Sequence, residues 1–274
     1  MSTEALRVAV AQYAAGVSQA ESLGRLRELL PPRLGADVLV LPEYSDLDVS
    51  RLGRHGLEKR AASIGDNVFV EGLAEIASRG VLVVAGVVER SGGCLYSTVV
   101  AVAPTGRVER LYRKRVLFDA LGYRESDVLC RGDTRLALLD YMGYRIGVAV
   151  CFEIRFPEIS RALALAGADA IAVPAAWYSG PGKAEQLTFL AKARAAENTV
   201  YYIVADQAGP VFAGHSLVAD PYGHTVASLG ADAGYFETGL RSGLVAEARE
   251  KLPLLRLRQA AVEAANGGIR LLKL

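Results

Sequence analysis

The sequence predicts an α/β fold in which helices cover one mixed β-sheet or two. Three observations support this class. Apolar runs of strand length alternate with amphipathic stretches of helical length along most of the chain. Hairpin-like pairs of apolar runs interrupt this alternation, so antiparallel strands are expected beside parallel ones. No repeat, low-complexity linker or change of composition occurs before about residue 245, which favours a single domain.

In the first part of the chain, strand and helix patterns follow each other regularly. We predict strands over residues 6–13, 37–43 and 81–90, and helices over residues 21–34 and 69–80. Pro31 and Pro32 close the first helix and Gly80 closes the second. Residues 96–114 then form a hairpin that turns at residues 104–106.

The remainder of the chain repeats this organisation. Two more hairpins are predicted, over residues 134–151 and 215–230. Between them we predict two helices and two strands, which cover residues 156–167, 169–177, 183–198 and 199–207 in alternation. From Glu247 the chain is charged and amphipathic. We therefore expect a main domain over residues 1–246 and a C-terminal arm over residues 247–274 that packs on the body or on a partner subunit.

Composition narrows the class of protein. Of 274 residues, 51% are hydrophobic and 22% are charged, which is ample for a large core. The net charge is +1 and no long basic run occurs, so nucleic acid is not expected as a partner. The N-terminus has no secretory pattern, and no apolar stretch reaches the roughly 18 residues of a membrane span. Three cysteines, odd in number and far apart, argue against disulfides; we therefore expect a cytoplasmic protein.

Three chemically useful residues each follow an apolar strand: Glu43, Lys114 and Cys151. Strand ends are where sites form in open α/β sheets. Each residue type also has an ordinary structural role, the carboxylate and lysine on the surface and the cysteine in the core. Cys151 is distinguished because it ends a strand just before a helix that starts near Pro157. Such a turn exposes a nucleophile and leaves backbone N–H groups free to bind an oxyanion.

A cysteine nucleophile needs a base or a nearby cation. Two arrangements remain open from the residues alone. His215 is the best candidate for a Cys–His pair, although no local motif supports it. Glu43 serves instead if burial raises its pKa, with Lys114 holding the thiolate and the developing oxyanion. Cys94 and Cys130 are assigned structural roles.

Other chemistries find little support. The three histidines are scattered and no metal-ligand motif is present, so no metal is expected. The GPGK stretch at residues 180–183 lacks the longer glycine loop of a phosphate site, and GHSLV at residues 214–218 is not a serine-hydrolase elbow. No cofactor is expected.

Six stretches in order resemble the nitrilase, or carbon–nitrogen hydrolase, superfamily. The resemblance extends over roughly residues 6–240, and the stretches read LPEYSDLD, LYRKRVLFD, CFEIRFPE, PAAW, ARAAEN and HSLVADPYG. The resemblance implies a four-layer αββα sandwich of two mixed sheets covered by helices. It implies a Glu43–Lys114–Cys151 triad and a second glutamate at Glu125.

The resemblance also assigns roles. Cys151 would form a covalent intermediate with an amide or nitrile carbon, and Glu43 would move the protons. Lys114 and the backbone N–H of Phe152 would bind the oxyanion, and Glu125 would position the substrate. Two positions depart from the common family pattern: Glu153 stands where Asp is usual, and Asp206 where Asn is frequent.

Other polar residues have alternative roles. Arg155 forms either an ion pair with Glu153 or Glu158, or a clamp for a substrate carboxylate. Trp177 and Tyr178 either wall the pocket or belong to the core. Residues 194, 197 and 198 share a helix face and predict a structural network.

We expect a thiol hydrolase of a small amide that acts as a homodimer or larger homo-oligomer. A nitrilase, an N-carbamoyl amino acid hydrolase and a non-catalytic binding protein of the same fold are the alternatives.

Overall fold

The computed structural model describes residues 5–266, and its centre is a pair of six-stranded mixed sheets. In the first sheet, the central strands β1, β2 and β3 are parallel, their neighbours β14 and β4 are antiparallel to them, and β5 is antiparallel to β4. The strand order is β14 (Gly234–Leu240), β1 (Leu6–Gln12), β2 (Val38–Val40), β3 (Leu82–Ser91), β4 (Cys94–Val102), β5 (Val108–Arg113).

The second sheet has the same plan. Its central strands β9, β10 and β11 are parallel, their neighbours β8 and β12 are antiparallel to them, and β13 is antiparallel to β12. The strand order is β13 (Thr225–Ser228), β12 (Leu217–Ala219), β11 (Tyr201–Asp206), β10 (Ala170–Ala175), β9 (Tyr144–Val148), β8 (Leu138–Tyr141). A small ribbon, β6 (Asp119–Ala120) and β7 (Tyr123–Arg124), stands apart from both sheets.

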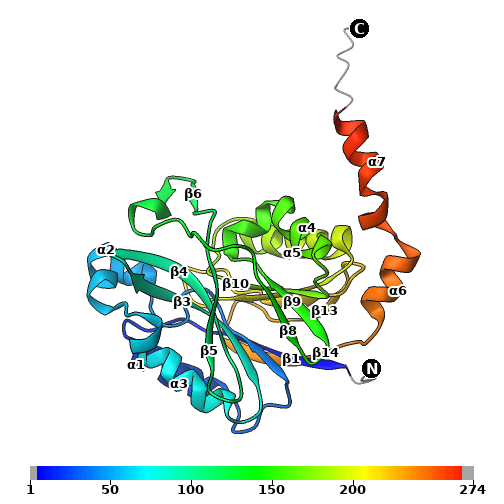
Figure 1. Ribbon diagram of the computed structural model, residues 1–274. Coiled ribbons are helices and arrows are strands. Elements are labelled where there is room, and N and C mark those ends of the chain that lie inside the picture. The colour runs from blue at the N-terminus through cyan, green and yellow to red at the C-terminus, as the bar shows by residue number, and fades with distance from the viewer. Residues whose placement is uncertain (1–4, 267–274) are drawn as a thin grey trace, which may run out of the picture.

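Helices cover the outer face of each sheet, so the predicted αββα sandwich is confirmed (Figure 1). Helices α1 (Gln19–Leu29) and α3 (Val68–Ala77) lie over the first sheet, and α4 (Pro157–Leu165) and α5 (Lys183–Asn198) over the second. Three single-turn helices occur in connections: η1 (Ile64–Asp66), η2 (Glu125–Asp127) and η3 (Cys151–Arg155).

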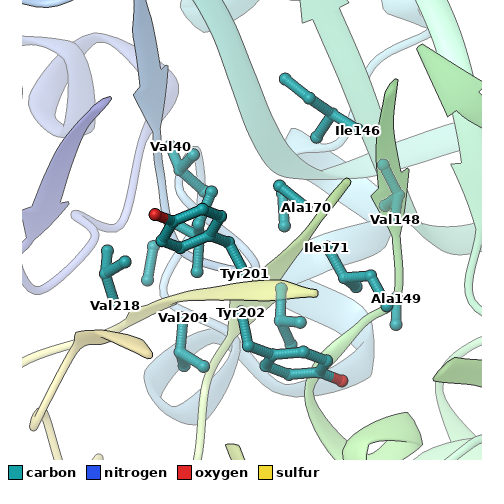
Figure 2. Packing of buried hydrophobic residues seen from close by; sticks show 14 of the residues in the cluster. Val40, Ile146, Val148, Ala149, Ala170, Ile171, Tyr201, Tyr202, Val204 and Val218 are labelled. Atoms are coloured by element: carbon teal, nitrogen blue, oxygen red, sulfur yellow. The ribbon is translucent and has the colours of Figure 1, made fainter. Parts of the chain in front are cut away.

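The central strands read as continuous apolar runs because both of their faces are buried. In β1, Val8 and Val10 point into the core between the sheets, whereas Ala9 and Ala11 point toward α1 and α3. The period of two places alternate residues on opposite faces. Figure 2 shows part of the core between the sheets, with Val40 of the first sheet among residues of the second.

The helix that follows β2 was not predicted. Helix α2 (Val49–Arg60) buries only Leu57 and is interrupted at Gly53, whose φ of 56° lies in the left-handed region. Its sequence therefore has neither a wide apolar face nor a continuous helical pattern.

The predicted domain boundary at residues 246/247 falls within helix α6 (Leu244–Lys251). This helix packs on the body, because Leu244, Val245 and Ala248 are buried. The following helix, α7 (Leu254–Asn266), buries none of its residues and extends away from the sandwich (Figure 1). The last eight residues of the expected arm lie outside the described residues.

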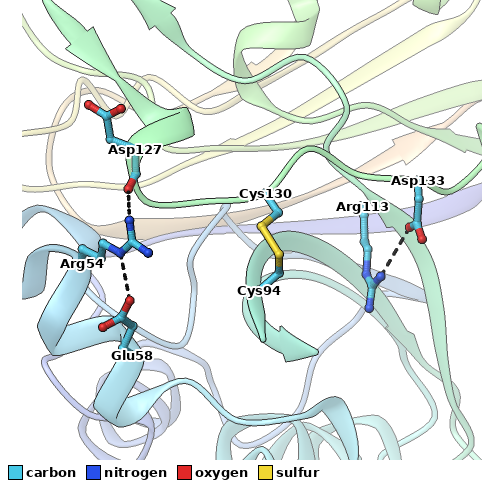
Figure 3. The surroundings of a disulfide bond; sticks show 7 residues. All are labelled: Arg54, Glu58, Cys94, Arg113, Asp127, Cys130 and Asp133. Carbon is cyan, nitrogen blue, oxygen red and sulfur yellow. Dashed lines mark hydrogen bonds and ion pairs between the residues drawn. A yellow bond between two sulfur atoms is a disulfide. The ribbon is translucent and has the colours of Figure 1, made fainter. Parts of the chain in front are cut away.

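The expectation of a protein without disulfides was wrong, because Cys94 is bonded to Cys130 (Figure 3). They are 36 residues apart in sequence, but the start of β4 and the segment after η2 lie side by side, and the Cys130 N–H donates to the Leu95 carbonyl at 2.8 Å. An odd cysteine count means only that one cysteine is left over; here it is Cys151. Cysteine usage therefore no longer supports a cytoplasmic location.

Within residues 5–266, none of the helices combines the length and apolarity needed to cross a bilayer.

Candidate active site

Cys151 lies at the end of β9, in a turn between the second sheet and α4. The residue opens η3 with φ of 43°, and its side chain is buried. A left-handed conformation costs a residue with a Cβ roughly 1–2 kcal/mol, so the surrounding structure must stabilise this turn. Such a conformation bends the chain sharply and turns the thiol away from the line of the strand.

Glu153 holds the turn from inside the protein. Its fully buried carboxylate accepts hydrogen bonds from the backbone N–H groups of Val150 at 2.9 Å, Arg115 at 2.9 Å and Val116 at 3.1 Å. The Tyr112 hydroxyl donates a fourth bond at 2.7 Å. One side chain thereby ties the chain before Cys151 to the chain after Lys114.

Arg194 of α5 holds the same turn from the helix layer. Its guanidinium donates to the carbonyls of Ile154 at 2.9 Å and Arg155 at 3.2 Å, and pairs with Glu197 at 3.0 Å. The Asn198 amide donates to the Arg194 carbonyl at 2.9 Å. The predicted structural network on this helix face is confirmed.

Lys114 lies between two carboxylates. Its Nζ is 3.0 Å from Glu43 Oε1 and 2.9 Å from Glu125 Oε1. All three side chains are almost completely buried. Glu43 follows β2, Lys114 follows β5 and Glu125 begins η2, so the sheet edge brings together residues that are far apart in sequence.

Three residues that support the Glu43 cluster were not predicted from the sequence. The Ser97 hydroxyl donates to Glu43 Oε1 at 2.7 Å, and the Gln207 amide donates to the Glu43 carbonyl at 2.8 Å. The Tyr44 hydroxyl donates to Glu125. Ser97 and Gln207 lie outside the six stretches that resemble the family, whereas Tyr44 stands beside Glu43 in LPEYSDLD but was assigned no role there.

Gly86 of β3 allows the Glu43 segment to approach the sheet. A Cβ at Gly86 would lie 2.6 Å from the Glu43 Cα and 2.8 Å from the Pro42 carbonyl oxygen, both of them backbone atoms. A glycine inside a predicted strand is the signal for such an approach.

Burial sets the protonation states of the site. Burial raises the pKa of Glu43 above its ordinary value, against the attraction of Lys114. Burial opposes charge on Lys114 too, but Glu125 and Glu43 hold the pKa of its ammonium well above the usual range. Burial, and then the charge of Glu43, raises the pKa of the Cys151 thiol well above its ordinary value. The thiol is therefore neutral at neutral pH and needs a base to become a nucleophile.

Cys151, Glu43, Lys114 and Glu125 border one cavity of about 370 Å³. Its aromatic walls are Tyr44, Phe118, Tyr123, Phe152, Trp177, Tyr178 and Phe212. His215 borders a different hollow, so the Cys–His alternative finds no support. The cavity has the size and the mainly apolar lining of a small-molecule site.

Trp177 and Tyr178 both line the cavity, and Trp177 is also buried. The Trp177 backbone N–H donates to Asp206 Oδ1 at 2.7 Å. Asp206 Oδ2 is buried without a hydrogen-bond partner among the described residues. Burial raises the pKa of Asp206 well above its ordinary value.

Arg155 lines the cavity and makes no ion pair within residues 5–266, so the predicted pairs with Glu153 and Glu158 are absent there. Its Nη2 donates to the Gln186 side-chain oxygen at 3.1 Å, and its Cζ lies 4.4 Å from the centre of the Trp177 ring. Over the same residues, no three His, Cys, Asp or Glu side chains come together as ligands for a metal ion.

Comparison with known proteins decides the family. The model of the carbon–nitrogen hydrolase family matches residues 7–250. The chain belongs to the carbon–nitrogen hydrolase family. The family match covers both sheets and the cavity between their ends, and it identifies the protein as an enzyme that hydrolyses carbon–nitrogen bonds.

Relatives of this carbon–nitrogen hydrolase extend over nearly its whole length. It is 34% identical to a Mycobacterium tuberculosis protein named as a hydrolase, over 92% of this chain and 95% of that protein. It is 29% identical to the omega-amidase NIT2 of Danio rerio, over 95% of this chain and 97% of that protein. Among solved structures, Nit3 of Saccharomyces cerevisiae superposes with a TM-score of 0.80 at 23% identity, over 93% of this chain and 97% of that one. That likeness shows the shared fold.

Proposed function

We propose that this carbon–nitrogen hydrolase cleaves a small-molecule amide by nucleophilic catalysis at Cys151. The arrangement that carries the proposal is the buried cluster in which Lys114 lies 3.0 Å from Glu43 and 2.9 Å from Glu125, on the cavity that Cys151 also borders. Acylation of a cysteine needs a base and an oxyanion site, and this cluster supplies the groups for both.

In the first half-reaction, Glu43 takes the proton of the Cys151 thiol as Sγ attacks the amide carbon. The carbonyl π electrons move to oxygen, and the oxyanion is bound by the Lys114 ammonium and the Phe152 backbone N–H. The intermediate then collapses to a thioester. The C–N bond breaks, and the nitrogen leaves as ammonia or an amine with the proton that Glu43 held.

In the second half-reaction, Glu43 takes a proton from water as the water oxygen attacks the thioester carbon. The same donors bind the second oxyanion. Collapse breaks the C–S bond, the carboxylic acid is released and Cys151 recovers its proton. Glu125 keeps Lys114 in place and binds the substrate nitrogen. A neutral thiol favours this general-base route over a preformed thiolate.

The names of two relatives, omega-amidase and deaminated glutathione amidase, favour an amide over a nitrile or a carbamoyl group. The cavity has aromatic walls that include Trp177 and Tyr178. These walls would exclude water and hold the carbon chain of the substrate.

We further propose a homodimer or larger homo-oligomer in which residues 247–274 form an arm. Helix α7 buries no residue within this chain, although it carries several leucines. A cytoplasmic location and the division at residues 246/247 also remain predictions; cell fractionation and truncation after residue 246 test them.

Ammonia release from a panel of substrates tests the activity. The panel contains aliphatic amides, monoamides of dicarboxylic acids, N-carbamoyl amino acids and nitriles. We expect release from amides that disappears in Cys151→Ala, with the circular dichroism spectrum unchanged. Equal release by the variant, or silence across the panel, would overturn the proposal.

A further inference from the structure

The segment that follows η2 holds the backbone of Lys114 in place. The Gly132 N–H donates to the Lys114 carbonyl at 2.8 Å, and the Thr134 hydroxyl accepts from the Arg113 N–H at 2.9 Å. Asp133 pairs with the Arg113 guanidinium at 3.3 Å (Figure 3). A Cβ at Gly132 would lie 2.7 Å from the Lys114 carbonyl oxygen, so the two stretches of chain are in close contact. The position of Lys114 therefore depends on this segment.

The same segment carries Glu125 at its other end. The N–H groups of Val128 and Leu129 donate to the Glu125 carbonyl at 3.0 and 2.9 Å. Most of residues 125–134 is exposed or half-buried, and Leu129 is the one apolar side chain there that is buried. Segments with few buried apolar contacts open locally at a small cost in free energy. Noncovalent contacts alone would therefore hold this segment weakly.

A disulfide joins this segment to the strand that supports the cluster around Lys114. Cys130 is bonded to Cys94 at the start of β4 (Figure 3). Further along β4, the Ser97 carbonyl accepts from the Lys114 N–H at 2.8 Å, and the Ser97 hydroxyl donates to Glu43 at 2.7 Å. The S–S bond therefore ties the segment to the strand that supports the Lys114–Glu43 pair.

The two bonded cysteines are accessible to a small reductant. Cys94 and Cys130 are half-buried, whereas Cys151 is buried. A dithiol supplies two electrons and two protons, converts the S–S bond into two thiols and becomes a disulfide itself. The segment after η2 would then be free to shift. A misplacement of about 1 Å in a catalytic group can cost ~10²-fold in rate.

We propose that the Cys94–Cys130 disulfide positions Lys114 and Glu125 for catalysis, so that a dithiol reductant reversibly lowers turnover. The inference rests on the proposed function for the roles of these two side chains and adds a dependence on redox state. Neither cysteine of the bond borders the cavity, so the bond acts through residues 125–134 and not on the substrate. The reduction should therefore lower kcat and change KM little.

Steady-state ammonia release before and after reduction tests the inference. The oxidised enzyme is treated with dithiothreitol, which is removed by gel filtration under nitrogen before the amide of the panel with the highest rate is added. We expect kcat to fall ~10–100-fold, as for a small displacement of catalytic groups, with KM within ~2-fold. Oxidised glutathione should restore kcat, because it takes back the two electrons and two protons and leaves as two reduced molecules. A reduced enzyme with unchanged kcat would overturn the inference.

The Cys94→Ser/Cys130→Ser double variant is the matched control. It keeps Cys151 but has no disulfide to open, so its kcat should equal that of the reduced wild type and should respond to neither reagent. Inhibition of this variant by dithiothreitol, or a kcat equal to that of the oxidised wild type, would assign the redox effect to another group and overturn the inference.

Hydrogen exchange followed by mass spectrometry separates this inference from the proposed function, because it needs no turnover. On reduction, we expect a loss of protection in peptides from residues 113–134, with peptides from α3 and α5 unchanged. If no amide were hydrolysed, this local loss would still support the positioning role although the hydrolytic proposal had failed. Unchanged exchange at residues 113–134 would overturn the inference. An equal loss over the whole chain would overturn it too, because the bond would then stabilise the fold without positioning these residues in particular.

Discussion

Replacing Glu153 by glutamine tests whether one buried side chain aligns the nucleophile with the oxyanion site. The glutamine oxygen can still accept from Tyr112 and from the backbone N–H groups of Arg115 and Val116. Its NH₂ group then faces the Val150 N–H, which loses its acceptor. A buried donor left without a partner costs about 1–3 kcal/mol in the free energy of unfolding.

The catalytic consequence is larger than the structural one, because Val150 directly precedes Cys151. Loss of the tether displaces the thiol, and a misplacement of about 1 Å can cost ~10²-fold in rate. We therefore expect kcat for amide hydrolysis to fall about 10–100-fold with a small change in KM. Urea unfolding and steady-state ammonia release measure the two effects.

Glu158→Gln is the matched control, since Glu158 is exposed at the start of α4 and accepts no described side-chain hydrogen bond. It should leave both quantities unchanged. A Glu153→Gln enzyme with wild-type kcat and lowered stability would show that Glu153 is only structural. Wild-type values of both would refute the argument from its four hydrogen bonds.

Three further predictions follow from the site. Gly86→Ala should lower the free energy of unfolding in urea by about 1–3 kcal/mol and should also lower activity, because the new Cβ displaces the Glu43 backbone. Gly24→Ala is the control: a Cβ there meets nothing within 4 Å, so neither quantity should fall. Because the pKa of Asp206 is raised in the folded state, the folded protein binds the Asp206 proton more tightly than the unfolded chain does. The stability contributed by this proton is complete below about pH 4 and declines as the pH rises toward the folded-state pKa. The Tm advantage of Asp206→Asn over wild type should therefore grow from pH 4 to 8, and a constant difference would contradict this reasoning. Lys114→Met should lower kcat ~10²–10³-fold, as for other oxyanion donors, and a change under threefold would remove Lys114 from the oxyanion site.

The sequence predicted the elements whose apolar patterns are strong. The helix expected over residues 183–198 coincides with α5, and the strand over residues 81–90 differs from β3 by one residue at each end. Helix α2 was not predicted because its sequence is mostly exposed, is interrupted by a glycine and has almost no apolar periodicity. Strand β14 was also not predicted, because GYFETGL buries little beyond Leu240 and its partner β1 lies far away in the sequence.

The site residues also fall into those that the sequence could predict and those that it could not. Glu43, Lys114 and Cys151 could be found because each ends an apolar strand, and strand ends converge. Their mutual distances depend on how two sheets stack, which local patterns do not encode. The start of α5 was not expected at the cavity, because nothing in the GPGK stretch indicates that the Lys183 carbonyl accepts from the Trp177 indole N–H. The disulfide was missed because pairing depends on proximity in space.

The disulfide also changes what happens when the backbone is cut. The Cys94–Cys130 bond closes a covalent ring that contains β5, Lys114, Glu125 and the β6–β7 ribbon. The tip of that ribbon is accessible, with Leu121 80% exposed. A protease that nicks the chain there would leave two pieces that migrate as one species on a gel until a reductant separates them. The nicked enzyme would keep Lys114 and Glu125 on opposite sides of the cut, joined through sulfur rather than through the peptide chain.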